Sequence, residues 1–390
     1  MRILEINKFN HIRGGADRHF VDLTRLLESA GIETAVFAMD HPENLHSESS
    51  KYFVSRVDYQ NGSVLNKIKG ALRIFWSFEA KRKIARLLDE FKPDVVHIHN
   101  IYHQISPSIL PEIKKRGIPI VMTVHDWKLV CPNYLLNCEK PYCEKCVSGK
   151  YWHCVANKSV KKSYLKSLLC VLELHFHKWL GVYEKNVDLY IAPSEFVKNV
   201  LVQSGFGENR IKVIPHFVEI VEVSPRQETR AENYAFYFGR VSKEKGADEL
   251  IAIFKNLPMK IVLAGNRDDD FEIPNRPNVE YVGFKNSAEL ENLIQKSKFV
   301  VSASRLPETF GLVALEALKN EKAFVGYDAG ALGEIVKNGV NGYLAKNQKE
   351  FKDKIAEYAA GNAPKFRFEA EKYDPEKYLR KIVDIFQSVC

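Results

Sequence analysis

Short apolar runs alternate with amphipathic segments along the first half of the chain. In the opening segment, Phe20, Leu23 and Leu27 recur at the spacing of one helix face, between a glycine turn and a second apolar run. Runs of this length and composition predict buried β-strands at residues 3–6, 35–38, 94–99, 118–125 and 187–192. Strands that alternate with helices predict a parallel sheet with helices on both faces.

The same alternation returns after Pro225. Strands are predicted at residues 234–239, 259–264, 279–282 and 299–304, followed by a helix at 312–318, and the polar stretch from Ile214 to about Asn233 predicts a linker. We therefore expect an α/β protein of two Rossmann-like, doubly wound parallel-sheet domains facing across a cleft, one over residues 1–215 and one over 216–371. A ligand is expected between the carboxyl ends of their strands.

Length and composition agree with two soluble domains. The chain has 390 residues, of which 45% are hydrophobic and 27% charged, and these values allow large cores without lipid. The first residues enter a strand pattern without a basic region and a long apolar one, and residues 165–180 are apolar but interrupted by charged and histidine side chains. We therefore expect a cytoplasmic protein without a membrane span.

The formal charge of +8 is concentrated in the first half of the chain. Residues 1–195 carry 28 Lys and Arg against 21 Asp and Glu, whereas the remainder carries 29 against 28. The basic runs at 81–83, 114–116 and 158–166 are either solvated helix faces or a surface for an anionic acceptor or anionic lipid head groups. The second interpretation predicts a peripheral protein at the inner face of the cytoplasmic membrane. Nucleic acid is not expected, because no recognition motif accompanies the charge.

The most informative stretch holds two glutamates, Glu308 and Glu316, on either side of a Phe-Gly turn that joins a predicted strand to a predicted helix. A helix N-terminus attracts anions through its N–H groups, and a carboxylate accepts two hydroxyl hydrogens at once. The arrangement suits a polyhydroxylated, anionic ligand, although an ordinary exposed Glu pair would have the same spacing. The backbone groups expected at the helix N-terminus belong to Thr309, Phe310, Gly311 and Leu312.

Together with its neighbours, this stretch resembles the donor site of the retaining GT-B glycosyltransferases of the group 1, or GT4-type, family. The resemblance rests on the Glu-x7-Glu spacing, the Ser-Ala-Ser loop at 302–304 and the segment 330–335, and it extends over nearly the whole chain. It implies that Glu308 faces the transferred sugar, that Glu316 binds the nucleotide ribose, and that a last helix, within about 372–390, packs back on the first domain. It also implies same-face attack, with the departing phosphate receiving the acceptor proton.

Negative charge builds on a departing diphosphate, so cations or oriented dipoles are needed beside it. Arg240 and Lys245 directly follow a predicted strand and resemble the family's phosphate-binding pair, with a basic surface loop as the alternative. Gly14 and Gly15 precede a predicted helix, where a backbone without Cβ can approach a phosphate closely. His125 ends a predicted strand and matches the family's active-site histidine, which we expect to hydrogen-bond the sugar rather than act as a general base.

Two segments depart from the family's usual sequence, and a third is similar to a motif of the metal-dependent GT-A class. The hinge, usually Pro-Asn-Gly-x-Asp, is Pro-His-Phe-Val-Glu at 215–219, and residues 319–323 replace a smaller, glycine-containing segment. The three aspartates at 268–270 are similar to a metal-binding Asp-x-Asp, but they follow a strand of the second domain and predict a solvated loop. We therefore expect that catalysis requires no metal or other cofactor.

Five of the seven cysteines fall within the 24 residues of the insert 131–154. A Cys-x2-Cys pair with flanking thiols can complete a tetrahedral zinc site, whereas free buried thiols are usual in cytosolic proteins. The insert follows His125, so we expect it to cover the acceptor pocket rather than take part in chemistry. The predicted ligands of a structural zinc are Cys138, Cys143, Cys146 and Cys154, with Cys131 upstream and His153 adjacent.

These patterns predict a retaining hexosyltransferase that moves a sugar from a nucleotide-diphosphate sugar, expected to be a UDP-sugar, to a glycan or lipid-linked acceptor in surface polysaccharide or glycoconjugate synthesis. A GT-B sugar phosphorylase or epimerase and a non-catalytic carbohydrate-binding scaffold at the membrane surface are the alternatives. A nicotinamide oxidoreductase is disfavoured, because the Gly14-Gly15 turn lacks the third glycine and the acidic ribose ligand. The sequence does not select the base, the sugar, the acceptor or the linkage.

Overall fold

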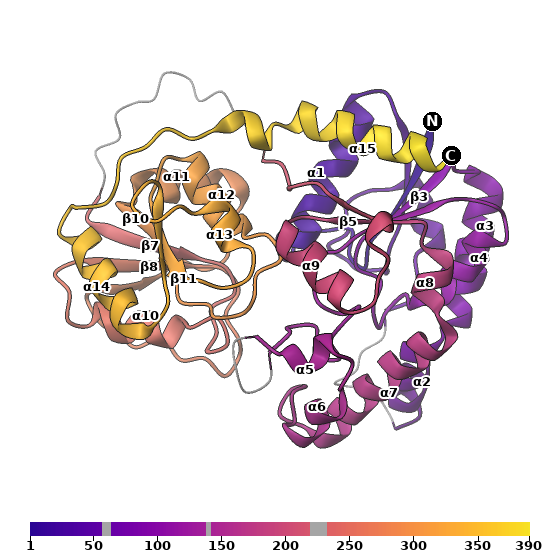
Figure 1. Ribbon diagram of the computed structural model, residues 1–390, viewed down its shortest axis with the longest axis horizontal. Helices are drawn as coiled ribbons and strands as arrows, with labels where there is room; N and C mark the ends of the chain where they lie inside the picture. The colour runs from indigo at the N-terminus through magenta and orange to yellow at the C-terminus, as the bar shows by residue number, and fades with distance from the viewer. Residues whose placement is uncertain (57–63, 138–141, 219–231) are drawn as a thin grey trace. The chain divides into compact units, whose positions relative to one another are not determined.

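The computed structural model describes residues 1–56, 64–137, 142–218 and 232–390 (Figure 1). The chain divides into two compact units. Unit 1 comprises Met1–His216 and Glu376–Cys390, and unit 2 comprises Phe217–Pro375. Each unit is built on a six-stranded sheet in which every pairing is parallel, so the predicted class of two Rossmann-like α/β domains is confirmed. The predicted linker at 214–233 lies mostly outside the described residues.

The sheet of unit 1 has the strand order β2-β1-β3-β4-β5-β6, and the order reverses between β1 and β3. Its strands are β1 Arg2–Ile6, β2 Glu33–Phe37, β3 Val95–Ile98, β4 Ile120–Thr123, β5 Leu189–Ala192 and β6 Ile211–Val213. Its helices are α1 Gly15–Ser29, α2 Val64–Phe75, α3 Phe78–Phe91, α4 Leu110–Lys114, α5 Glu144–Val147, α6 Trp152–Ala156, α7 Tyr164–Leu180, α8 Val182–Asn186, α9 Glu195–Gln203 and α15 Pro375–Val389, and its 3-10 turns are Glu48–Tyr52, Pro107–Ile109 and Glu208–Arg210.

The sheet of unit 2 has the order β12-β11-β10-β7-β8-β9, which reverses between β7 and β10. Its strands are β7 Tyr234–Phe238, β8 Lys260–Ala264, β9 Val279–Tyr281, β10 Phe299–Ser302, β11 Phe324–Tyr327 and β12 Gly342–Ala345. Its helices are α10 Ala247–Phe254, α11 Ser287–Lys296, α12 Leu312–Lys319, α13 Leu332–Ile335 and α14 Gln348–Ala359, with a 3-10 turn at Ala370–Tyr373.

Side-chain alternation along the strands of unit 2 builds two apolar cores. Tyr237 and Val301 point to the face covered by α10 and α14, whereas Phe236 and Val300 point to the face covered by α11 and α12. Figure 1 shows these helices on opposite sides of the sheet. A sheet buried on both faces is the reason that these strands are continuous apolar runs in the sequence.

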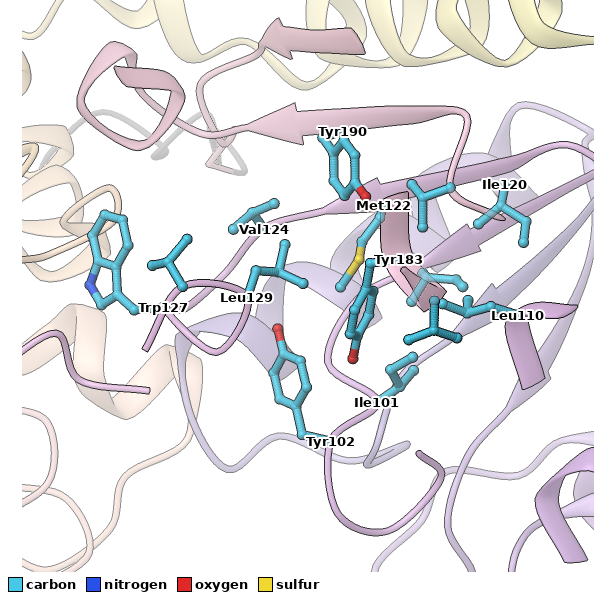
Figure 2. Close-up of a cluster of buried hydrophobic side chains, with 14 of the residues drawn as sticks. Ile101, Tyr102, Leu110, Ile120, Met122, Val124, Trp127, Leu129, Tyr183 and Tyr190 are labelled. Atoms are coloured by element: carbon cyan, nitrogen blue, oxygen red, sulfur yellow. The ribbon is translucent and has the colours of Figure 1, made fainter. Parts of the chain in front are cut away.

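In unit 1 the same alternation separates an apolar face of the sheet from a polar one. Ile120, Met122 and Val124 enter a large apolar cluster that also contains Tyr183 and Tyr190 (Figure 2). The residues between them point the other way, and the buried side chains on that face include Glu5 of β1, His97 of β3, His99 directly after β3 and Thr123 of β4. Unit 1 therefore keeps a polar layer inside its sheet, described below.

The predictions made from charge and hydropathy concern a membrane span and the basic runs of the first half. No helix in the described ranges is long and apolar enough to cross a bilayer. Within the basic runs, Lys81 and Arg116 pair with Glu112, and Lys114 pairs with Asp188. These pairs favour the interpretation of solvated, salt-bridged helix faces for residues 81–83 and 114–116.

Candidate functional site

The predicted donor residues of unit 2 lie where the strand order reverses, at the carboxyl ends of β7 and β10. Lys245 belongs to the loop after β7 and Glu308 to the loop after β10, and Lys245 Nζ donates to Glu308 Oε1 at 2.8 Å. The two side chains are 28% and 31% exposed, so a ligand can reach both. The fold thus brings together one cation and one carboxylate that are 63 residues apart in sequence.

Glycines hold the backbone around this pair. Gly330 pairs with Glu308 across a β-bridge, and the N–H of Ala331 donates to the Glu308 carbonyl at 2.9 Å. A Cβ on Gly330 would lie 2.3 Å from that carbonyl oxygen, and Gly330 has φ +67°. Gly246 allows a similar approach, because a Cβ there would lie 2.5 Å from the carbonyl oxygen of Ala303. The position of Glu308 is therefore set by backbone contacts that only glycine permits.

Helix α12 begins directly after the Phe-Gly turn, as predicted. Gly311 caps it in the left-handed region, with φ +102°, and the first turn contains no acidic residue. The partial positive charge of the helix N-terminus is therefore not offset by a side chain of that turn. Glu316 lies on the same helix but is buried, with 9% exposure. The turn residues Thr309 and Phe310 precede this N-terminus, with Phe310 packed into the apolar core.

The remaining charged residues of the unit 2 prediction are placed differently. Arg240 is partly exposed and forms an ion pair with Glu244 at 2.6 Å. The backbone carbonyl of Arg240 accepts a 2.6 Å hydrogen bond from the Tyr237 hydroxyl, which anchors the loop while its side chain faces solvent. Asp269 and Asp270 are exposed after β8, in agreement with the solvated loop predicted for 268–270.

In unit 1, Gly14 is the N-cap of α1 and Gly15 its first residue. Gly14 has an extended backbone, with φ −162°, and a Cβ there would have no heavy atom within 4 Å. Neither backbone conformation nor packing within the chain requires a glycine at this position. The close approach of a ligand to this backbone stays a prediction.

His125 lies in the polar layer of unit 1, in a network that the sequence did not predict. Glu5 accepts hydrogen bonds from His97 Nδ1 and His99 Nε2, each at 3.0 Å. This arrangement leaves His99 Nδ1 without a proton, so it accepts from His125 Nε2 at 2.7 Å. Likewise His97 Nε2 accepts from the Thr123 hydroxyl at 2.8 Å. One buried carboxylate therefore fixes the tautomers of three histidines.

Two further rings and a helix complete this layer. His19 of α1 and His216 have ring centroids 3.9 Å apart, and His216 stacks on His125 at 5.2 Å. Helix α15 covers the layer, because the Tyr378 hydroxyl bonds His19 Nε2 at 3.1 Å and Phe386 packs on His97. The sequence signal was present in the alternating Val-His-Ile-His at 96–99, at and directly after the end of β3, but the contact with Glu5 depends on the register of β1 and β3.

Four histidines of this layer, His19, His99, His125 and His216, are neutral at physiological pH. Burial lowers the pKa of His99 to about 4, and the neighbouring His97 adds to the shift while Glu5 opposes it. Burial also lowers the pKa of His216 to about 3, and burial with neighbouring histidines holds the pKa of His125 well below its usual value. Burial would raise the pKa of Glu5, but His97 and His99 outweigh it and lower that pKa to about 2. A neutral His125 is a hydrogen-bonding group and a weak base.

The loop after His125 is fixed by a buried ion pair. Lys128 Nζ donates to Glu173 Oε2 of α7 at 2.7 Å, and both side chains are almost fully buried. Asp126, which lies between His125 and Lys128 in sequence, accepts from the Lys128 N–H at 2.8 Å, and burial raises the pKa of Asp126 to about 6. The loop that presents His125 is thus rigidly attached to α7.

The predicted zinc ligands are partly gathered. Cys138 lies outside the described residues, whereas Cys143, Cys146 and Cys154 are buried and Cys146 lies close to each of the other two. The structure adds Cys131 and His153 to this group.

Solved glycosyltransferases share this architecture over the whole chain. The apo form of the lipopolysaccharide outer core galactosyltransferase WaaB has a TM-score of 0.61 and 16% identity, with 100% of both chains covered. Alr3699/HepE of Anabaena in complex with UDP-glucose has a TM-score of 0.63 and 17% identity, again with 100% of both chains covered. At these identities the likeness establishes the fold. The two Rossmann-like units have the GT-B fold.

The family follows from the sequence models. Residues 13–222 match Glycosyltransferase Family 4, and residues 222–375 match Glycosyl transferases group 1. The chain belongs to this GT4-type, group 1 family of glycosyltransferases, as its motifs predicted. A curated relative, an uncharacterized 42.6 kDa protein in the cps region of Klebsiella pneumoniae, is 23% identical over 373 residues, which are 91% of this chain and 91% of that protein.

Proposed function

We propose that the protein is a retaining hexosyltransferase that transfers a sugar from a UDP-sugar to a glycan or lipid-linked acceptor in surface polysaccharide synthesis. The observation that carries the proposal is the pair of Lys245 and Glu308 at the strand-order reversal of unit 2, where open α/β sheets bind their ligands. The choice of donor is supported by HepE, which was solved with UDP-glucose, and the choice of pathway by the relative in the cps region.

The residues have complementary chemical roles in this proposal. Lys245 exchanges its contact with Glu308 for the diphosphate of the donor, and Arg240 and the N-terminus of α12 add positive charge as the leaving group forms. Glu308, released from Lys245, accepts hydroxyl hydrogens of the transferred sugar, and Glu316 accepts those of the ribose. No carboxylate is used as a nucleophile, and the departing phosphate takes the acceptor proton.

His125 contributes a neutral ring whose orientation is fixed through His99 and Glu5. Gly14 and Gly15 contribute backbone N–H groups at the N-terminus of α1. Donor binding uses only these charges and dipoles, so we expect transfer to continue after brief treatment with EDTA.

The test is a binding and transfer experiment on the full chain. Calorimetric titration with UDP, GDP and ADP is expected to give the tightest binding for UDP, and Lys245→Ala is expected to weaken it at least tenfold. Proton NMR of the product is expected to show the anomeric configuration of the donor. Preferred binding of GDP or ADP would overturn the choice of base, and an inverted product would overturn the stereochemistry.

A further inference from the structure

We propose that unit 1 contains a tetrahedral zinc site formed by Cys143, Cys146, His153 and Cys154. The four donors form a Cys3His set, which is one of the usual ligand sets of structural zinc. Three of them belonged to the set predicted from the sequence. His153 is the new ligand, and it replaces Cys138, which lies outside the described residues.

Three of these donors form one face of a coordination tetrahedron. Cys146 Sγ lies 3.6 Å from Cys154 Sγ, and His153 Nε2 lies 3.8 Å from Cys146 Sγ and 3.7 Å from Cys154 Sγ. Zn–S bonds of about 2.3 Å at tetrahedral angles place ligand atoms roughly 3.8 Å apart. The three edges therefore match the geometry around a single ion. Sulfurs in a disulfide are only about 2.05 Å apart, so these thiols are not oxidised to one another.

The fourth corner is assigned to Cys143. Its Sγ lies 3.0 Å from His153 Nε2, and Cys143 is the N-cap of α5, so that Cys143 and Cys146 form a Cys-x2-Cys turn. The N–H of Cys146 donates to the Cys143 carbonyl at 3.2 Å, which closes this turn. Cys131 Sγ is 3.1 Å from Cys146 Sγ and groups with Cys146 and Cys154, but its thiol donates to Asn133 Oδ1 at 2.9 Å, so we assign the fourth corner to Cys143.

His153 is oriented as a metal ligand. Its Nδ1 donates to the backbone carbonyl of Lys150, so its other nitrogen, Nε2, carries a lone pair and faces the three sulfurs. Metal-bound histidines commonly donate their second N–H to a carbonyl or carboxylate in this way. Without an ion, this lone pair would face three thiols that are weak hydrogen-bond donors.

The local structure also needs a cross-link. Helices α5 and α6, which carry the ligands, are only 4 and 5 residues long, and neither has a side-chain cap. Helices this short are not stable by themselves in water. An ion bound to both would hold them together and would fix the segment that follows the His125 loop.

The test is metal analysis of the full chain, purified with reductant and without a metal-affinity tag. We expect about one zinc per chain, and we expect Co²⁺ substitution to give the visible bands of a tetrahedral thiolate site. Cys146→Ser and His153→Ala should each lose at least about nine-tenths of the zinc. Cys131→Ser and two control variants, Cys170→Ala at a buried cysteine outside the set and Cys390→Ser at an exposed one, should keep it.

The outcomes separate the possibilities even if a variant fails to fold. Wild-type protein with no zinc, with bound iron, or with a disulfide among these cysteines by mass spectrometry would overturn the proposal. Loss of zinc from Cys131→Ser with retention in folded Cys143→Ser would overturn the assignment of the fourth ligand. With wild-type protein, chelation should change tryptophan fluorescence, because Trp152 directly precedes the ligands His153 and Cys154 in α6, and added Zn²⁺ should restore it.

Discussion

The two units share a sheet architecture but differ sharply in the chemistry of their side chains. All 12 histidines, all 7 cysteines and all 4 tryptophans lie in unit 1, and residues 217–375 contain none of them. Unit 2 presents fixed charges, backbone groups and glycines at its strand ends, whereas unit 1 contains the histidines and cysteines, whose side chains are able to titrate, to bind metals and to oxidise. We therefore expect donor binding by unit 2 to be insensitive to mild acid, and we expect the stability of unit 1 to decrease in mild acid.

The largest expected effect sharpens the role of unit 2. Glu308→Gln and Lys245→Ala should each lower transfer by about a hundredfold or more, because each removes a charge that acts on the sugar or diphosphate. Both side chains are partly exposed, so the free energy of unfolding should change by less than about 1 kcal/mol. Initial rates and circular dichroism measure the two effects.

Lys243→Ala is the matched control, because Lys243 is exposed in the same loop. Activity comparable to wild type in both Glu308→Gln and Lys245→Ala would remove the assigned site from unit 2.

The second effect concerns acid. The folded pKa of His99 is about 4, below its unfolded value, so its stabilising contribution is complete above about pH 6.5 and is lost as the pH falls through 4. This shift alone should lower the free energy of unfolding of unit 1 by about 3 kcal/mol between pH 7 and pH 4, and His216 adds to it. Urea unfolding followed by tryptophan fluorescence reports unit 1 alone.

His46→Gln is the control for this experiment, because His46 is exposed and lies outside the histidine layer. A fluorescence midpoint that stays constant from pH 7 to pH 4 would contradict the neutral histidine layer.

The third effect compares two glycines of unit 2 that both have positive φ. Gly330→Ala should destabilise the protein by about 2 kcal/mol or more, because the new Cβ adds a clash with Glu308 to the strained backbone. Gly339 has φ +77°, but a Cβ there would meet open space, so Gly339→Ala should lower the free energy of unfolding by only about 1 kcal/mol. Equal losses in urea unfolding, followed by circular dichroism, would show that the contact with Glu308 is not tight.

The smallest effect tests unit 1 as a ligand-binding unit. Gly14→Ala should change the free energy of unfolding by less than about 0.5 kcal/mol, because Gly14 is extended and nothing occupies the space of a Cβ. It should nevertheless weaken UDP-sugar binding by about tenfold, or about 1.4 kcal/mol, if a phosphate approaches this backbone. Unchanged binding in calorimetry would show that Gly14 has no role toward the donor.

Much of the fold could be predicted because most strands are buried on both faces and are therefore long apolar runs. Three strands were not predicted: β6 at Ile211–Val213, β11 at Phe324–Tyr327 and β12 at Gly342–Ala345. β6 has only three residues, and β11 and β12 contain glycine, so their pairing depends on neighbouring strands rather than on their own sequence.

The sequence predicted the Lys245–Glu308 site better than the histidine layer or the cysteine cluster, because the last two depend on contacts between strands or helices. Lys245 and Glu308 each follow a strand, so strand topology alone brings them near one another. The hydrogen bonds of Glu5 with His97 and His99 depend on strand register, and the contact of His153 with Cys143 depends on two very short helices. Neither the contacts of Glu5 nor the contact of His153 with Cys143 can be predicted from a local sequence pattern.

The position of α15 at the end of the chain sets the order in which the two units can complete their folding during translation. Unit 1 is discontinuous, because Glu376–Cys390 joins it only after all of unit 2 in the chain. During translation, residues 217–375 leave the ribosome as a complete folding unit, while the layer around Glu5 and His97 still lacks Tyr378 and Phe386. We therefore expect the histidines of unit 1 to stay accessible to water until α15 has been synthesised and packs over them.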